Sequence, residues 1–209
     1  MPVDIVREAQ NALRSLKAEL RPFVVIRPPF SLSADDASKR RLIMRGDPLE
    51  IELLLLNVMK NAAEAVQGLP DGAVLVKFRR ETLPSPLAEN PSPSPAAPSA
   101  EAVIVEVEDN GPRLSDEAFE RLTRVSQSVK DEGLGLGLGI VRSLVEENGG
   151  RIAITRREDL SGRGLRVTLC FDLDAEGLKA QSAPHTDPAD KSAAQAFQRS
   201  HEPAAKTAK

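Results

Sequence analysis

The stretch 130–150, KDEGLGLGLGIVRSLVEENGG, constrains the fold most, because a glycine-rich run leads straight into a helical pattern. Glycine stands at every second position of the run: Gly133, Gly135, Gly137 and Gly139. A one-sided apolar stripe at helical spacing follows: Ile140, Val141, Leu144 and Val145. Unpaired amide groups and the positive end of a helix dipole form an anion site. We therefore expect a polyphosphate to bind where this loop meets its helix.

Two common nucleotide motifs are excluded in this stretch. The pattern GxxxxGK[ST] is absent, and GxGxxG fails because Leu138 stands three residues after Gly135. A flexible linker is the alternative interpretation, but linkers are rich in glycine and polar serine. Here the glycines alternate with leucines before an amphipathic helix.

The first part of the chain predicts a helix over 3–20, with Pro22 ending it. Its apolar stripe is suited to packing either on this domain or on a helix outside it. A short strand is expected at 23–27, a polar loop at 31–41 and another short strand at 42–44.

A long helix is predicted to begin after Asp47, a favourable N-cap, and to run to about Gln67. One of its faces is apolar and suited to a core. The other carries Asn57, Asn61 and Glu64 in one line. Two amides and an acid make a less ordinary solvent face than alternating lysine and glutamate.

Strands are predicted at 72–79, 102–108, 151–155 and 165–171, and a short helix capped by Ser115 at 115–124. The strand at 102–108 alternates apolar and acidic residues before the sharp turn Asp109-Asn110-Gly111-Pro112. Three regions are expected to be mobile or disordered: the proline-rich insertion 84–100, the segment 125–132 and the tail 174–209.

Composition narrows the possible partners. The net charge of −3 gives no general attraction to nucleic acid, and the absence of Trp and Tyr removes the usual stacking platforms. Cys170 is the single cysteine, so no internal disulfide is possible. No apolar stretch approaches the length of a membrane span. We expect a cytoplasmic segment without membrane or nucleic-acid contact.

Three motifs in a fixed order resemble the ATP-binding catalytic domain of sensor histidine kinases, over roughly residues 20–173. Residues 54–65, LLLNVMKNAAEA, are similar to the N box of that family. Asp109-Asn110-Gly111-Pro112 resembles its G1 box, and residues 133–141 resemble its G2 box. The resemblance implies an α+β two-layer sandwich, the Bergerat ATP-binding fold, whose mixed five-stranded sheet carries three helices on one face. The domain would span 21–173, preceded by a linker helix at 1–20.

The resemblance also implies roles for individual residues. Asp109 would accept a hydrogen bond from the adenine amino group, and Gly111 would let the base approach the backbone. Asn61 would give an amide oxygen to Mg²⁺, and Asn57 would face the phosphates of ATP. The phosphates would be wrapped by the amide groups of Gly133, Gly135 and Gly137. Lys130 would contact the γ-phosphate, or else be a solvated lysine of the lid.

Three functions are consistent with these motifs. The first is a protein histidine kinase that transfers the γ-phosphoryl group of ATP. The second is an ATPase of the gyrase type, whose members carry a glutamate general base where this chain has Asn57; an amide cannot take that proton. The third is an inactive nucleotide-binding module. It is suggested by Arg113 in place of the usual second G1 glycine, by a lid without the usual Pro-Phe pair, and by Leu165 in place of threonine.

The two histidines, His185 and His201, both lie in the predicted tail. Neither is on an amphipathic helix that could present its imidazole. The phosphoacceptor histidine is therefore expected on a dimerisation domain in a longer parent chain or in another protein. A response regulator would be an indirect partner.

Overall fold

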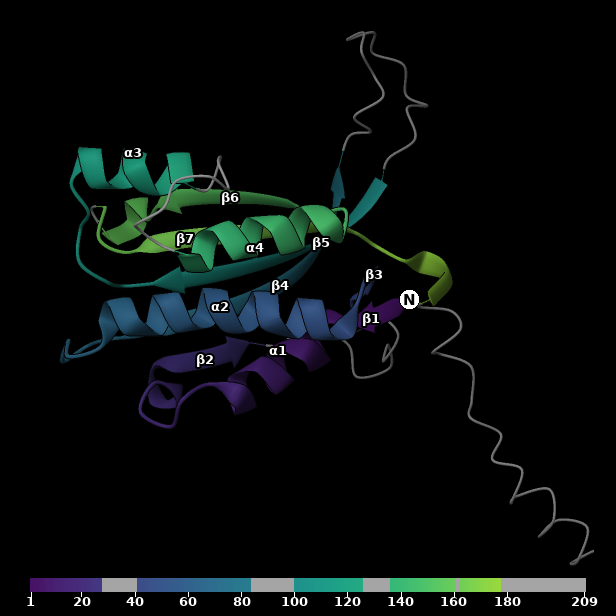
Figure 1. The fold of residues 1–209 in the computed structure, drawn as a ribbon, viewed down its shortest axis with the longest axis horizontal. Coiled ribbons are helices and arrows are strands. Elements are labelled where there is room, and N and C mark those ends of the chain that lie inside the picture. The colour runs from purple at the N-terminus through teal and green to yellow at the C-terminus, as the bar shows by residue number, and fades with distance from the viewer. Residues whose placement is uncertain (28–40, 84–99, 126–135, 161, 178–209) are drawn as a thin grey trace, which may run out of the picture.

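A mixed five-stranded sheet forms the centre of the fold (Figure 1), in a computed structural model that describes residues 1–27, 41–83, 100–125, 136–160 and 162–177. The strands, in spatial order, are β2 (Val24–Arg27), β4 (Val74–Leu83), β5 (Ala100–Asp109), β7 (Leu165–Asp172) and β6 (Arg151–Arg156). β2 is parallel to β4, and the other neighbours are antiparallel. The predicted mixed sheet is confirmed.

The helices α1 (Ile5–Ser15), α2 (Pro48–Val66) and α4 (Leu136–Glu147) cover one face of this sheet (Figure 1). α3 (Asp116–Val125) lies near β6, and two short 3₁₀ turns, η1 (Arg21–Phe23) and η3 (Glu158–Leu160), flank the sheet. The expected two-layer α+β architecture is therefore confirmed. It places the end of β5 and Ile154 of β6 beside the C-terminal half of α2.

The strand β5 shows why the sheet has two unlike faces. Val103, Val105 and Val107 are buried against the helices. Glu106 and Glu108 alternate with them and point to the opposite face. β4 follows the same alternation, with Val76 on the helical side and Lys77 on the other. The alternation thus builds an apolar layer on one side and a charged layer on the other.

The predicted helix at 3–20 is wrong in its bounds. Pro2–Asp4 is a strand, β1, which pairs with β3 (Ile43–Arg45) in a small second sheet. Asp4 caps α1, since its Oδ1 accepts the amide of Val6 at 3.2 Å. The helix ends where Leu16 takes an extended conformation. Of the two packing alternatives, packing on the domain is the one observed: Ala9 and Ala12 belong to the same core as α2.

The start of α2 is as predicted and is held by a residue far away in sequence. Asp47 Oδ1 accepts the amides of Leu49 at 2.8 Å and Glu50 at 3.3 Å. Asn148, just after α4, accepts the Asp47 amide at 3.0 Å and donates to Glu50 Oε2 at 2.9 Å. This side chain fastens the end of α4 to the beginning of α2.

The ordered domain also continues past the predicted boundary at Asp174. The amide of Asp174 donates to the carbonyl of Ile43 at 2.7 Å, and its buried carboxylate lies 3.5 Å from Arg45 Nε. The chain is described to Gly177, whose amide donates to Asp174 Oδ1 at 3.1 Å. The predictions for residues 84–99, 126–135 and 178–209 lie outside the described residues.

None of the helices in the described ranges combines the length and the apolar character needed to cross a lipid bilayer.

Candidate nucleotide site

A cavity of about 280 Å³ lies between α2 and the ends of β5, β6 and β7. Most of its walls are apolar, which suits a flat aromatic ring. The lining residues from the helices are Val58, Asn61, Ala62, Ala65, Leu122 and Leu138. Those from the sheet and its turns are Val107, Asp109, Pro112, Leu114, Ile154, Leu165 and Val167. Asp109 is the single carboxylate among these described lining residues, so it fixes the polarity of the cavity.

Asp109 ends β5 and is 6% exposed. Its Oδ1 accepts the amide of Gly111 at 2.8 Å, and the amide of Leu165 also donates to its carboxylate. Burial raises the pKa of Asp109, while these two amides and the charge of Arg157 act in the opposite direction. An ionised carboxylate accepts about four hydrogen bonds, so capacity remains for a donor in the cavity.

Two glycines allow the backbone to close around Asp109. A Cβ on Gly111 would lie 2.8 Å from Asp109 Oδ1 and 3.4 Å from Ala65 Cβ. Gly164, in the turn between β6 and β7, has φ +71°, and a Cβ there would lie 2.0 Å from the Asp109 carbonyl oxygen. Larger residues at either position would displace the strand end that carries the carboxylate.

The side chain of Asn110 fixes the turn that follows Asp109. Its Nδ2 donates to the carbonyl of Asp71 at 2.6 Å, and its Oδ1 accepts the amide of Ala73 at 2.8 Å. The backbone of Asn110 also donates to the Ala73 carbonyl at 3.2 Å. The turn is thereby joined to the loop between α2 and β4.

The structure brings Asn61 together with Asp109 but leaves Asn57 outside the cavity wall. Asn61 lines the cavity from α2. Asn57 lies one turn earlier on the same helix, and its Nδ2 donates to the Leu53 carbonyl at 2.8 Å. The polar line predicted on this helix therefore runs from the cavity outward along α2.

The glycine run enters its helix earlier than predicted. α4 begins at Leu136, so Gly137 and Gly139 lie in its first turn and not in the loop. The apolar stripe explains this difference: Leu138 lies one turn before Val141 and is also buried, so the packing pattern extends back into the glycines. Gly133, Gly135 and Lys130 lie outside the described residues.

Arg113 faces a second hollow, of about 600 Å³, and is absent from the lining of the cavity described above. Gly162 lies beside it, since a Cβ on that glycine would lie 3.7 Å from Arg113 Nε. In the same hollow the guanidinium of Arg156 lies 4.4 Å from the ring centre of Phe119. Arg113, which stands where a second G1 glycine is usual, thus lies outside the cavity that contains Asp109.

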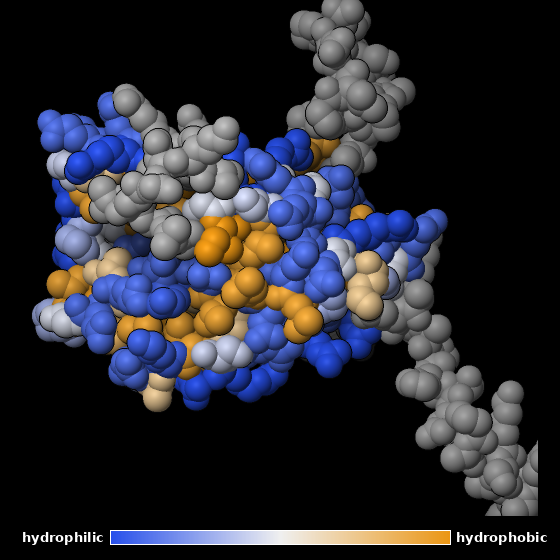
Figure 2. Space-filling model, viewed as in Figure 1, coloured by the Kyte–Doolittle hydropathy of each residue, from blue (hydrophilic) through white to orange (hydrophobic). Residues whose placement is uncertain are grey.

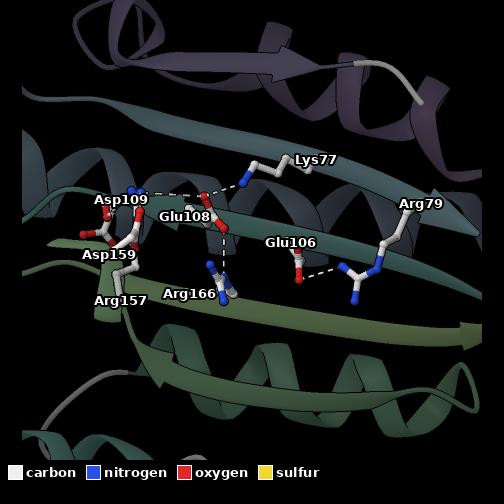
Figure 3. A network of polar contacts seen from close by, with 8 residues as sticks. All are labelled: Lys77, Arg79, Glu106, Glu108, Asp109, Arg157, Asp159 and Arg166. Carbon is white, nitrogen blue, oxygen red and sulfur yellow. Dashed lines mark hydrogen bonds and ion pairs between the residues drawn. The ribbon is translucent and has the colours of Figure 1, made fainter. Parts of the chain in front are cut away.

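A charged cluster lies on the other face of the sheet, directly behind Asp109 (Figure 3). Glu108 is 2% exposed and accepts from Lys77 Nζ and from Arg166 Nε, each at 2.8 Å. Burial alone would raise the pKa of Glu108, but the hydrogen bonds and charges of these two cations lower it below the ordinary value. Sequence reasoning missed this cluster: basic residues alternate along β4 and acidic ones along β5, but the alternation does not tell which of them stand opposite each other.

No group of three or more His, Cys, Asp or Glu side chains that could hold a metal ion is found within the described ranges. A divalent ion at this cavity would have the Asn61 amide oxygen as a protein ligand and would take its other ligands from a bound phosphate and water. Mg²⁺ accepts this arrangement, because it binds few protein oxygens beside substrate phosphates. The residues present therefore fit Mg²⁺ bound together with a polyphosphate.

A family model described as "Histidine kinase-, DNA gyrase B-, and HSP90-like ATPase" matches residues 46–175, well over half of the chain. The chain belongs to this family. The match contains the cavity, Asp109 and the glycine run, so the predicted relationship is confirmed. The ATPase description supports ATP as the ligand of the cavity.

Curated relatives of this ATPase-family chain include a nitrogen regulation protein and a sensory histidine kinase. Nitrogen regulation protein NtrY of Azorhizobium caulinodans is 30% identical over 142 residues, which cover 66% of this chain and 16% of that protein. Sensory histidine kinase/phosphatase NtrB of Klebsiella oxytoca is 32% identical over 109 residues, covering 52% and 29% respectively. The chain therefore spans less than a third of these relatives.

Solved histidine kinase domains share the fold. The mycobacterial sensor histidine kinase MprB aligns with a TM-score of 0.56 and 19% identity, over 83% of this chain and 97% of that one. The catalytic domain of histidine kinase ThkA aligns with a TM-score of 0.55 and 17% identity, over 83% and 96%. At such identities the likeness establishes the architecture alone.

Proposed function

We propose that this chain is the ATP-binding catalytic domain of a sensor histidine kinase, which transfers the γ-phosphoryl group of ATP to a histidine on a dimerisation domain. One observation carries the proposal: a buried carboxylate, Asp109, lies in an apolar cavity with the amide of Asn61 on the facing helix. The family match and the names of the relatives point the same way. Because the activity consumes ATP, we propose that it takes place in the cytoplasm.

The cavity would select adenine by its edge. An ionised Asp109 accepts hydrogen bonds, and the exocyclic amino group of adenine donates them. Guanine would present an oxygen at that place, and two acceptors facing each other in a buried site are unfavourable. Apolar walls such as Ile154 and Val58 would contact the faces of the ring.

The phosphates would extend from the cavity toward Asn57 and the start of α4. Leu138 of α4 lines the cavity, so the unpaired amide groups of the first turn lie at its edge. We propose that Asn61 ligates Mg²⁺, that Asn57 contacts phosphate, and that Gly133, Gly135, Gly137 and Lys130 enclose the triphosphate. Mg²⁺ would neutralise charge on the transferred group, and the residues of the chain would hold it in line with an acceptor.

Transfer to an external acceptor is favoured over hydrolysis by the residue on α2. A water molecule needs a general base, and the amide of Asn57 cannot accept its proton. The Asn57 amide is also engaged with the Leu53 carbonyl, which orients it. Arg113 lies outside the cavity, which supports an active domain over the binding-module alternative.

We propose that the acceptor domain docks on three exposed apolar side chains of the helical layer, Leu49 and Leu53 of α2 and Ile140 of α4. These side chains are 76%, 46% and 45% exposed. Figure 2 shows hydrophobic side chains gathered over this middle part of the helical face. Leu53 lies one turn from Asn57, so a helix seated there would carry its histidine to the phosphate end of the site.

The residues of α1 share the core, and we therefore assign residues 1–20 to the domain as well as to the connection with a preceding helix.

The test is incubation of the chain with γ-labelled ATP, alone and with a separately produced dimerisation domain of a relative. We expect no label on this chain, acid-labile label on the acceptor, and slow phosphate release. Acid-labile label on this chain that disappears in His185→Ala would contradict the assignment of the acceptor to another domain. Rapid phosphate release without acceptor would favour the ATPase alternative.

A further inference from the structure

Arg157 connects Asp109, the proposed adenine-binding carboxylate, to the charged cluster around Glu108 on the other face of the sheet. It directly follows β6, and its side chain is 16% exposed. Its Nη1 donates to the carbonyl oxygen of Asp109 at 3.3 Å, and its Nη2 lies 4.0 Å from Glu108 Oε2. Figure 3 shows the guanidinium between these two neighbours, with Asp159 on its outer side. One side chain therefore reaches two consecutive residues at the end of β5.

The main chain of Arg157 holds the turn that touches Asp109. Its amide donates to the carbonyl of Gly164 at 3.3 Å, and its carbonyl accepts the amide of Gly162 at 2.9 Å. Gly164 is the residue whose missing side chain makes room for the Asp109 carbonyl. Backbone and side chain of Arg157 thus fasten the same two segments to each other, the β6–β7 turn and the end of β5.

The described charged side chains around Glu108 include one more cation than carboxylates. Three cations, Lys77, Arg157 and Arg166, surround Glu108 at 2.8–4.0 Å. The carboxylates of Glu108 and Asp159 balance two of them. Of these cations, Arg157 is the one whose charge favours the ionised form of Asp109.

We propose that Arg157 is a positioning residue for nucleotide recognition: its hydrogen bond to the Asp109 carbonyl and its contact with Glu108 hold the end of β5 so that the Asp109 carboxylate is aimed at the base. This inference rests on the proposed function, since it assumes that Asp109 reads adenine. Arg157 does not line the cavity, and it acts on the ligand only through Asp109.

The sign of the pH dependence follows from the groups around Asp109. Arg157 is the charged side chain that acts on Asp109 itself, and the neutral Asn61 of α2 lines the same cavity. The other charged groups near the end of β5 contact its neighbours: Asp159 pairs with Arg157, Arg163 donates to the Asn110 carbonyl, and Lys77 and Arg166 pair with Glu108. Burial already raises the pKa of Asp109, and Arg157 lowers it. Removal of Arg157 raises the pKa of Asp109 further. As the solution is acidified, Asp109 therefore becomes protonated at a higher pH than in the parent chain.

The experiment titrates ATP and GTP into the 209-residue chain by calorimetry between pH 5.5 and 8, with Mg²⁺. For Arg157→Gln we expect the Kd for ATP to rise about tenfold at pH 7.5 and the preference over GTP to shrink, as for loss of one charge-assisted contact. The loss of affinity on acidification should begin at a higher pH than in the parent chain. Ionisation of the nucleotide phosphates is common to both proteins and cancels in the comparison.

The matched control is Arg79→Gln. Arg79 lies on the same charged face and pairs with Glu106 at 2.6 Å and Glu81 at 3.1 Å, two residues along the strand from the Glu108 cluster. Its removal takes the same charge from the same face. For Arg79→Gln we expect an unchanged Kd for ATP and an unchanged pH profile. Its melting temperature should fall by about the same small amount as that of Arg157→Gln.

Arg157→Lys keeps the charge without the planar fork of donors, so we expect a smaller loss, of about threefold, with a pH profile near that of the parent. If Arg157→Gln does not fold, the lysine variant decides. Parent-like Kd, selectivity and pH profile in every folded Arg157 variant overturn the inference. Failure of the parent chain to bind ATP instead contradicts the proposed function.

Discussion

At the residue scale, Asp109 combines burial with several fixed hydrogen bonds, so its selectivity is testable by an isosteric change. Asp109→Asn keeps the shape and removes the charge that accepts from the adenine amino group. We expect the Kd for ATP to rise about 10–100-fold, as for loss of a hydrogen bond to a charged group. Calorimetry with ATP and GTP should show that the variant no longer distinguishes them. A parent chain that binds GTP as tightly as ATP would contradict the assignment of Asp109.

Gly111 provides a second test, because its Cβ position lies 2.8 Å from Asp109 Oδ1. Gly111→Ala should push the carboxylate from its place, with a Kd for ATP raised about tenfold and stability lowered by roughly 1–2 kcal/mol through overpacking. Gly139→Ala is the control, since no atom of the described residues outside its own helix turn lies within 4 Å of its Cβ position in α4. It should raise stability by about 0.5–1 kcal/mol. Thermal melts and ATP titrations of both variants measure the two effects.

Glu108 makes the acid stability of the fold predictable. Its folded-state pKa is lowered, so its contribution is present above the unfolded value of about 4.3 and is lost as pH falls through the folded value. Glu108→Gln should reduce the free energy of unfolding by roughly 1–3 kcal/mol at pH 7, discounted because Lys77 and Arg166 are partly exposed. Urea titrations at pH 7 and pH 3.5 should show the difference shrinking in acid. Glu81→Gln, at an exposed pair, should change little at either pH.

Single residues were predictable from sequence where a local motif defines them. Asp109 and Gly111 follow from a turn at a strand end; the structure places Asp109 in the cavity wall and Gly111 against its carboxylate. Glu108 and Arg157 were missed, because their contact depends on which residues of β4, β5 and β7 stand opposite each other. Register places Glu108 opposite Arg166 on one side and Leu75 on the other, and no local pattern contains that information.

At the element scale, α2 has three different sides, and the exposed apolar one can be tested separately from the cavity. Leu53→Asp should reduce phosphoryl transfer to an acceptor domain at least tenfold, since a charge in the centre of an interface is unfavourable. The Kd for ATP should stay within about twofold, because Leu53 does not line the cavity.

Val25→Asp is the control for that variant. Val25 is 54% exposed on β2 and, by strand alternation, points to the face of the sheet away from the helices. It should leave transfer unchanged. Loss of transfer in both variants would show a general effect on folding, and full transfer by Leu53→Asp would contradict the docking patch.

Periodicity predicted the elements well where an apolar stripe and a cap agree, as in α2. It failed at the ends of stripes. Residues 3–20 keep helical spacing although Asp4 caps the helix and Leu16 leaves it, because Val3 and Leu20 are buried by a strand and a turn. α4 starts early for the related reason that Leu138 packs. Burial alone does not reveal which backbone conformation delivers a side chain to the core.

At the scale of the whole molecule, the β4–β5 hairpin permits a test of its long connection. Leu83 and Ala100 are direct partners at the end of the ladder. Replacement of residues 84–99 by Asn-Gly should therefore leave the fold intact, since two residues close an antiparallel pair in a tight turn. Thermal melting and ATP binding should match the parent within a few degrees and about twofold. A large loss of melting temperature would show that the connection contributes to the core.

The described part of the chain begins and ends on the same short strand. The amide of Asp174 binds the Ile43 carbonyl, and β1 pairs with β3 along its other edge. Pro2 and Gly177 are therefore both anchored close to β3, so a force applied to the main chain at either residue would act on β3 first. β3 directly precedes the start of α2 (Figure 1), whereas Gly111, beside Asp109, lies against Ala65 in the last turn of α2. Along α2, such a force would therefore reach the proposed nucleotide site only through the length of the helix.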